Sequence, residues 1–211
     1  MTFPSRRFLL AGTGALAGCS ILPKGNPRPQ LFRLTVAPPM AASGPALKGQ
    51  LLVDTPFAPA ALDTDRIALT RSATSFDYFG EVAWSDRAPL MVQSLLIESL
   101  EASGRTPTVA RESLALRAEW ALKTDLLHFE ARYGGTSGGG DAPPEVRISF
   151  SAKLVRMSDR VVVGQHMANA VQRAARNEVS AIVDAFDQAL HQIIQETIDW
   201  VVATGLSAVP R

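Results

Sequence analysis

The chain has 211 residues, of which 46% are hydrophobic, and its 21 Lys and Arg nearly balance its 20 Asp and Glu. This length fits one domain of ordinary size, or at most two very small ones. A net charge of +1 argues against a nucleic-acid binder, which needs a basic excess on one face. A single cysteine excludes an intrachain disulfide framework and a cysteine-based zinc cluster.

The N-terminus has the pattern of a signal peptide. Arg6 and Arg7 come first, and an uncharged apolar run from Phe8 to Gly18 follows them. A short basic segment before such a run is typical of exported proteins. At 11 residues the run is too short for a permanent membrane span, which needs about 20. The sequence therefore predicts export, by either the general secretory or the twin-arginine route.

The apolar run ends in Leu16-Ala17-Gly18-Cys19, around the only cysteine of the chain. This segment resembles the bacterial lipobox, in which the thiol receives a diacylglyceryl group and becomes the new N-terminus. We therefore predict a signal peptide over 1–18 and lipidation at Cys19, with palmitate-type acyl chains that anchor the protein to a membrane. Ser20, where an Asp would favour the inner membrane, favours the outer membrane. The alternative is a buried free cysteine in an N-terminal helix.

A tether and one folded domain are expected after the signal peptide. Prolines and polar residues over 19–30 are typical of a short lipid-anchored tether. The domain is expected over 31–205. Its first predicted element is a strand in which Phe32, Leu34 and Val36 alternate with polar residues.

The next predicted elements are strands and one helix. An apolar run over 51–54 predicts a short strand, and the segments 66–70 and 75–79 predict a hairpin with a loop of ordinary length. Apolar residues at helical spacing predict a helix over 86–103, with Asp86 as its N-cap.

Three long strands are expected next. The first covers 120–133, and its apolar side chains change face between Leu126 and Leu127, which predicts a β-bulge or burial on both faces. Strict alternation over 146–154 predicts a strand with one dry face and one wet face. A turn then returns the chain in a strand over about 160–172.

A long C-terminal helix completes the pattern. Asn177 is its expected cap, an apolar stripe extends from Val179 to Val201, and Gly205 is its expected end. Two groups of strands, each followed by a long helix, predict an α+β (or α/β) fold. We expect a single domain in which a mixed, mostly antiparallel sheet packs against two long helices.

The sequence does not have the pattern of an enzyme. Residues 135–139 match G-x-S-x-G, but a predicted strand follows them instead of the helix that an esterase serine needs, so a glycine-rich hairpin tip is the better interpretation. His128, His166 and His191 have no metal-ligand spacing, and no carboxylates form an acid–base pair. We therefore expect no catalytic residue, no metal site and no cofactor.

Aromatic residues are the remaining candidates for contact with a partner. Trp84 directly precedes the first helix, and Tyr78 and Phe79 lie in the predicted hairpin. The ordinary interpretation is packing in the core. The functional interpretation is a partner or lipid contact, because exposed aromatic side chains often anchor interfaces.

Taken together, these segments resemble one known family, the ABC-type transport auxiliary lipoproteins, a paraquat-inducible protein C-like group. The resemblance lies in the order and spacing of several short segments, since none of them is diagnostic alone. They are the lipobox at Leu16–Cys19, Phe32-Arg33-Leu34, Leu62–Ile67, Phe76–Phe79, Trp84, Ala88-Pro89-Leu90, Trp120-Ala121-Leu122, Phe129-Glu130 and Ile198-Asp199-Trp200.

The resemblance implies a non-catalytic lipoprotein of the bacterial envelope that faces the periplasm. Its implied partners are an MCE-domain protein, a permease and a cytoplasmic ATPase, with phospholipid or another hydrophobic molecule as cargo. The implied role is to dock the periplasmic part of the transporter at the outer membrane, and a homo-oligomer is compatible with it. Two alternatives stay open: an outer-membrane assembly or cell-wall scaffold, and a stand-alone lipid binder with an apolar cavity between sheet and helices.

Overall fold

The described part of the chain forms one α+β domain, as the sequence predicted. The computed structural model describes residues 28–39, 44–106, 108–111, 118–134 and 142–208. The predicted signal peptide, Cys19 and the G-x-S-x-G segment lie outside these residues. In chain order the elements are β1 (Gln30–Phe32), β2 (Gln50–Val53), β3 (Arg66–Ser72), β4 (Ser75–Trp84), α1 (Ala88–Ala102), β5 (Thr108–Arg111), β6 (Trp120–Arg132), β7 (Glu145–Arg156), β8 (Val161–Arg173) and α2 (Val179–Ser207).

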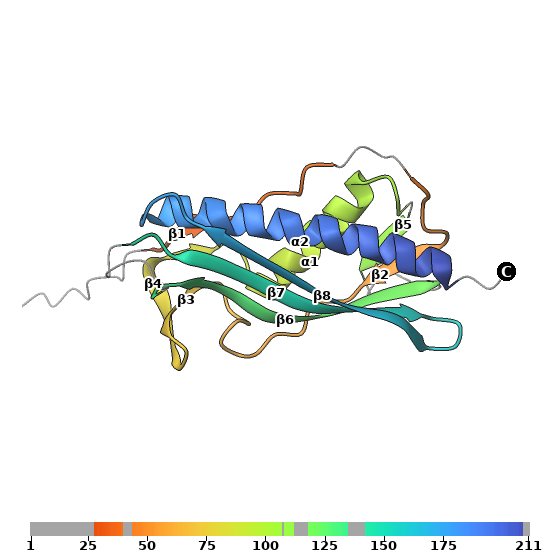
Figure 1. Ribbon diagram of the computed structural model, residues 1–211, viewed down its shortest axis with the longest axis horizontal. Coiled ribbons are helices and arrows are strands. Elements are labelled where there is room, and N and C mark those ends of the chain that lie inside the picture. The colour runs from red at the N-terminus through yellow and green to blue at the C-terminus, as the bar shows by residue number, and fades with distance from the viewer. Residues whose placement is uncertain (1–27, 40–43, 107, 112–117, 135–141, 209–211) are drawn as a thin grey trace, which may run out of the picture.

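Strand β6 organises a mixed, curled sheet of eight strands. It pairs antiparallel with β7 along its length, and on its other edge it pairs in parallel with β2 at Trp120–Leu122 and with β3 at Glu130–Arg132. Strand β8 extends the antiparallel side beyond β7. The domain is therefore elongated, with β1 and the β3–β4 hairpin at one end and β2 and β5 at the other (Figure 1).

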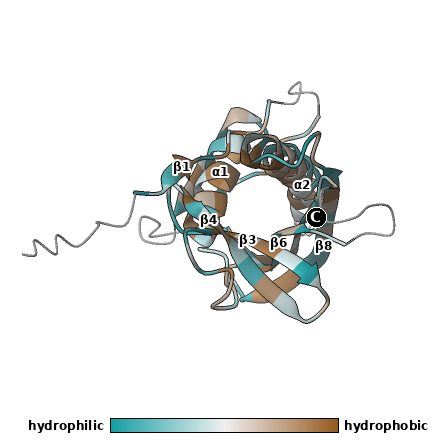
Figure 2. Cartoon of the chain, turned by 90° about the vertical axis from the view of Figure 1, so that its left-hand side faces the viewer, coloured by the Kyte–Doolittle hydropathy of each residue, from teal (hydrophilic) through white to brown (hydrophobic). Residues whose placement is uncertain are grey.

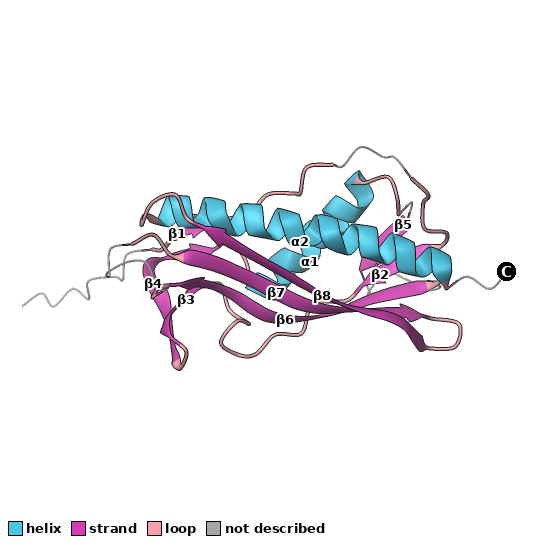
Figure 3. Cartoon of the chain, viewed as in Figure 1, coloured by secondary structure: helices cyan, strands magenta, loops and turns pink. Residues whose placement is uncertain are grey.

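Helix α2 covers the inner face of the long antiparallel strands, as Figure 3 shows. On the face of β7 that was predicted to be wet, Ser149 and Ser151 are buried, so that part of the prediction is wrong. The apolar stripe of α2 meets the inward side chains of β7, which alternate as the sequence predicted. Both sets are almost fully buried, and burying one large apolar side chain contributes about 1.5–3 kcal/mol. The largest members are Phe186, Leu190, Ile193 and Ile194 of the helix and Ile148, Phe150 and Leu154 of the strand.

The predicted irregularity in β6 is a β-bulge. The register with β7 shifts between Leu126 and His128, so Leu127 is the extra residue. Leu126 and Phe129 both face the core at 0% and 1% exposure, whereas Leu127 is 40% exposed. The bulge therefore explains why the apolar side chains change face at this point.

Helix α1 is buried around most of its circumference, because β2 and β5 pack on one side and the segment after β1 crosses the other. Its N-cap residue is Arg87 and makes no side-chain cap, so the prediction that Asp86 caps this helix is wrong. The carboxylate of Asp86 instead accepts a hydrogen bond from the N–H of Arg87 at 2.7 Å.

The first strand is shorter than predicted. It ends at Phe32, and the following residues cross between the two helices. The N–H of Thr35 donates to Asp187 of α2 at 2.6 Å, and the N–H of Ala37 donates to Ser99 of α1 at 3.2 Å. Side chains of the helices therefore satisfy backbone groups that a strand would have used, while Leu34 is still buried.

Both ends of α2 differ from the expectation. Its N-cap is Glu178 and has no side-chain cap, while Asn177 instead accepts a hydrogen bond from the hydroxyl of Tyr133 at 2.8 Å. The helix continues through Gly205 to Ser207. Gly205 is buried within the helix, and a Cβ atom at this position would overlap the side chain of Leu47. The glycine therefore permits close packing and does not end the helix.

Trp84 lies in the core, which agrees with the packing interpretation and leaves its side chain almost no exposed surface for a partner. Its side chain is 1% exposed. The ring packs edge-on against Phe129 and Phe186 at centroid distances of 5.8 and 5.2 Å, and these two rings lie 5.1 Å apart. The three rings join β4, β6 and α2, and the apolar layer between sheet and helices surrounds them (Figure 2).

We expect Trp84→Ala to lower the free energy of unfolding by about 3–5 kcal/mol, because it opens a cavity among the three rings. Trp84→Phe is the matched control and should cost less than half as much, since it keeps a ring and removes an indole N–H that has no partner among the described residues. Urea denaturation followed by far-UV circular dichroism measures both values. A loss below about 1 kcal/mol for Trp84→Ala would contradict a core role.

Candidate functional site

Tyr78 lies on the outer face of the β3–β4 hairpin and is half-buried. Its hydroxyl donates to the carbonyl of Ala61 at 3.1 Å, and the Arg66 guanidinium lies 3.7 Å from the centroid of its ring. The ring of Phe76, which is 42% exposed, packs edge-on against it at 5.6 Å. Of this group, Phe76 offers the most exposed apolar surface to a partner, and it was not one of the predicted contact residues.

Phe79 lies on the same strand and contacts the end of β6. Its ring is 6.3 Å from the ring of Tyr133, and both are half-buried. Arg71 lies 5.0 Å from the centroid of the Tyr133 ring. Partial burial raises the pKa of the Tyr133 hydroxyl, and the positive charge of Arg71 lowers it by a smaller amount. Both predicted contact residues of the hairpin, Tyr78 and Phe79, therefore pack beside another aromatic ring and an arginine.

A cleft of about 670 Å³ opens between this hairpin, the loop before β3 and the outer face of the long strands; we call it the hairpin cleft. Its floor includes His128, Glu130 and Arg132 of β6 together with Arg147 of β7. Its walls are the hairpin residues from Thr70 to Phe76 and the loop residues Pro59, Ala61 and Leu62.

Strand register explains why these side chains converge. Thr70 of β3 lies opposite Arg132 of β6, and Glu130 of β6 lies opposite Arg147 of β7. Residues directly opposite each other in a sheet point to the same face. Gly134, directly after β6, also lines the cleft. Its φ is 100°, and a Cβ atom there would lie 3.2 Å from the carbonyl of Arg71, so a glycine allows the chain to pass close to β3.

The β-bulge supplies two further side chains to the hairpin cleft. It places the exposed Leu127 and the half-buried His128 beside each other on the outer face. The Nδ1 atom of His128 lies 2.9 Å from a carboxylate oxygen of Glu130. Glu130 is only 4% exposed, and its other oxygen accepts a hydrogen bond from the N–H of Phe129 at 2.8 Å. The one carboxylate in the floor is therefore already fully engaged.

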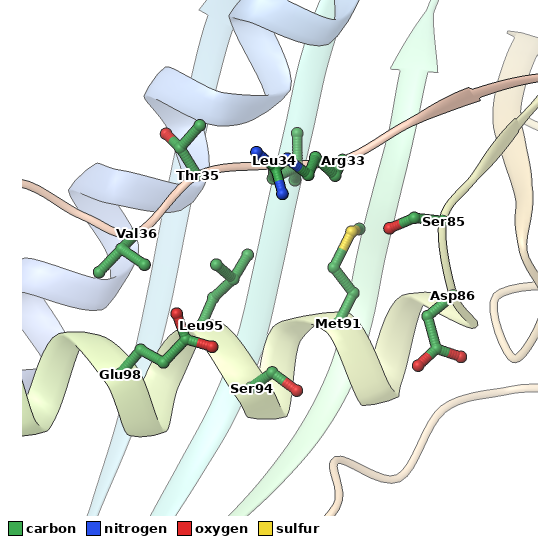
Figure 4. A pocket seen from close by; sticks show the side chains of 10 residues that line it. All are labelled: Arg33, Leu34, Thr35, Val36, Ser85, Asp86, Met91, Ser94, Leu95 and Glu98. Atoms are coloured by element: carbon green, nitrogen blue, oxygen red, sulfur yellow. The ribbon is translucent and has the colours of Figure 1, made fainter.

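A second cleft lies between α1 and the segment after β1 (Figure 4). Its volume is about 410 Å³, and Met91 and Leu95 of the helix point toward Leu34 across it. Polar side chains border the apolar ones, among them Arg33, Asp86 and Glu98. This cleft combines charges of both signs and favours no single class of ligand.

Two of the three histidines form hydrogen bonds between elements. His166 of β8 lies 2.8 Å from Glu196 of α2 and stacks on Trp200, and His191 of α2 lies 3.0 Å from the carbonyl of Thr35. Within the described residues, no group of three His, Cys, Asp or Glu side chains could hold a metal ion. Among the same residues, neither helix is long and apolar enough to cross a membrane.

Several known proteins are similar to this chain in sequence or in fold. The model of the family described as ABC-type transport auxiliary lipoprotein component matches residues 32–197. A crystal structure of a Xanthomonas campestris protein is similar with a TM-score of 0.77 and 28% identity, covering 84% of this chain and 97% of that one. A structure from Chlamydia trachomatis, with a TM-score of 0.52 and 10% identity over 76% of this chain and 99% of that one, shares the fold.

A curated relative from Bradyrhizobium diazoefficiens, an uncharacterized protein, is 28% identical over 192 residues. The match covers 90% of this chain and 50% of the relative, so the chain spans half the length of that protein.

The contact between Arg71 and Tyr133 can be tested by titration. In a Tyr78→Phe background Tyr133 is the only tyrosine, since the chain has two. We expect Arg71→Gln to raise the pKa of Tyr133 further, because the phenolate loses a nearby positive charge. The ultraviolet absorbance of tyrosinate reports the pKa directly.

The matched control is Arg173→Gln, whose guanidinium binds Glu145 and should leave the pKa of Tyr133 unchanged. Far-UV circular dichroism should show both proteins folded over the titration. An unchanged or lower pKa in the Arg71 variant would contradict the contact.

Proposed function

The chain belongs to the ABC-type transport auxiliary lipoprotein component family, and from this we propose that it docks an MCE-type transporter of phospholipid or another hydrophobic molecule at the outer membrane. In this role its acyl chains at Cys19 hold it in the membrane, and its folded domain binds the periplasmic part of the transporter. The ATPase and permease are separate chains. The family match, which covers most of the folded domain, is the observation that carries the proposal.

The architecture supports a binding role. The three buried rings and the layer between α2 and the sheet make the domain a rigid body. The β3–β4 hairpin extends away from that body, on the side opposite the helices (Figure 1). It presents Phe76, Tyr78 and Phe79 on a short, twisted pair of strands, and aromatic side chains of this kind often anchor interfaces. We therefore place the transporter contact at this hairpin.

The space between sheet and helices offers less support for a stand-alone lipid carrier. That alternative expects an apolar cavity in this space. Phe129, Phe150 and Phe186 occupy it instead, each at most 1% exposed. A scaffold that binds an outer-membrane barrel or the cell wall is the alternative that a partner experiment distinguishes.

The experiment is affinity capture of the full-length protein from gently solubilised envelopes, with partners identified by mass spectrometry. We expect an MCE-domain protein, its permease and its ATPase. We expect Cys19→Ala to recover at least about tenfold less of them, because anchoring raises the effective concentration of the two partners in one envelope.

Ser20→Ala is the matched control, since it keeps the thiol and should capture the same partners. Recovery of only a barrel protein or cell-wall material with the wild-type chain would contradict the transporter role and favour a scaffold.

A further inference from the structure

Three arginines line the hairpin cleft, and none of them has a carboxylate partner among the described residues. They are Arg71, Arg132 and Arg147, which come from three different strands. Among the described residues, none of the three makes an ion pair. Other surface cations of the described domain are paired, for example Arg87 with Asp63 and Arg173 with Glu145. The hairpin cleft is therefore a local concentration of uncompensated positive charge.

The neighbouring acidic groups do not neutralise these arginines. Glu130 contacts His128 at 2.9 Å, and Glu145, which lies opposite Arg132 in the sheet, contacts Arg173 at 2.7 Å. Each carboxylate is thus paired with a different basic residue. An anion that entered the hairpin cleft would not have to displace an existing ion pair to reach the three guanidiniums.

Hydroxyl groups at the hairpin tip add neutral donors. The Ser75 hydroxyl oxygen accepts hydrogen bonds from the N–H groups of Arg71 and Ser72, and the Ser72 hydroxyl oxygen accepts one from the N–H of Ser75. These bonds fix the tip and use the serine oxygens as acceptors, so their hydrogens remain to be donated. Several guanidiniums with nearby hydroxyl donors match the geometry and charge of a phosphate group.

The lining of the hairpin cleft also includes apolar side chains. Leu62, Phe76 and Leu127 belong to it, and the last two are exposed. A free phosphate ion would not use these apolar side chains. A phosphate attached to an apolar group would contact both the arginines and the apolar side chains.

We propose that the hairpin cleft binds the phosphate group of an anionic ligand, with Arg71, Arg132 and Arg147 as its charged contacts, and that a phospholipid headgroup is its source. The phosphate contact stands on the cleft alone. The choice of phospholipid rests on the proposed function, and free phosphate is the other source of the same chemistry.

The position of the hairpin cleft favours a lipid. The β3–β4 hairpin, which lines it, lies at the end of the sheet that carries β1, where the described chain begins (Figure 1). Only eight residues lie between the predicted acylation site Cys19 and Arg28, so the chain between them spans at most about 30 Å. The tether is therefore short enough to keep this end of the domain near a membrane surface.

The test is native mass spectrometry of the acylated full-length protein, released from non-ionic detergent after incubation with phosphatidylglycerol or with inorganic phosphate. The mass of the adduct identifies which of the two has bound. We expect the triple variant Arg71→Gln, Arg132→Gln, Arg147→Gln to bind phosphatidylglycerol at least about tenfold more weakly than the wild type.

The matched control removes three cations elsewhere, at Lys48, Arg160 and Arg176, and should bind like the wild type. A second variant, Leu127→Ser, separates the two sources. For a lipid it weakens binding of phosphatidylglycerol but not of phosphate, whereas for free phosphate it changes neither. Circular dichroism must show each variant folded.

Equal phosphatidylglycerol and phosphate binding by the wild type, the cleft variant and the control would overturn the proposal. A phosphate adduct without a lipid adduct, lost in the cleft variant, would support the phosphate site and overturn the phospholipid source. Transporter capture by the cleft variant is measured separately, so loss of lipid binding with partners retained would leave the docking role standing.

Discussion

The packing of α2 against the inner face of the sheet is the constraint on which the rest of the domain depends. The helix has 29 residues, and it can bury its apolar stripe only if the strands beneath it are long and curve around it. The paired strands β6, β7 and β8, with 12 or 13 residues each, provide that surface. Phe186 then reaches between Trp84 and Phe129, so one helical side chain connects the antiparallel strands to the hairpin side of the sheet.

The same long strand that supports the core also shapes the outer surface. Because β6 is longer than any of its parallel partners, β2 and β3 pair with opposite ends of its edge. This arrangement places the β3–β4 hairpin beside the last residues of β6. The β-bulge at Leu127 then places an apolar and a basic side chain on the outer face at that point. The hairpin cleft is thus largely a consequence of how the sheet is assembled, and the loop before β3 completes its walls.

Sequence periodicity predicted the elements that have one clear apolar face. The alternation in β7, the stripe of α2 and the change of face in β6 all appear as expected, because burial of one face dictates each pattern. Boundaries were less predictable. The alternation of Leu34 and Val36 has the period of a strand, yet hydrogen bonds from Thr35 and Ala37 to side chains of the two helices replace strand pairing there. Only the tertiary arrangement supplies those partners.

The candidate site could be predicted only in part. Tyr78 and Phe79 do lie in the hairpin. Trp84, which is also aromatic, is the last residue of the same strand and is buried because its ring packs against Phe186 of α2. The three arginines of the hairpin cleft lie at separate places in the sequence, and only the pairing of β3, β6 and β7 brings the strands that carry them side by side. Charge at spaced positions on wet strand faces is ordinary in sequences, so no local pattern marked these residues.

The proposed function requires the β3–β4 hairpin of an anchored lipoprotein to contact the periplasmic part of a transporter. Photo-crosslinking in intact cells tests this contact, with a photoreactive amino acid at Phe76 or, as the control, at the more exposed Val171 on the outer face of β8. If the hairpin makes this contact, we expect a crosslink from position 76 to an MCE-domain protein and none from position 171. Crosslinks to that protein from position 171 alone, or to a barrel protein from position 76, would contradict it.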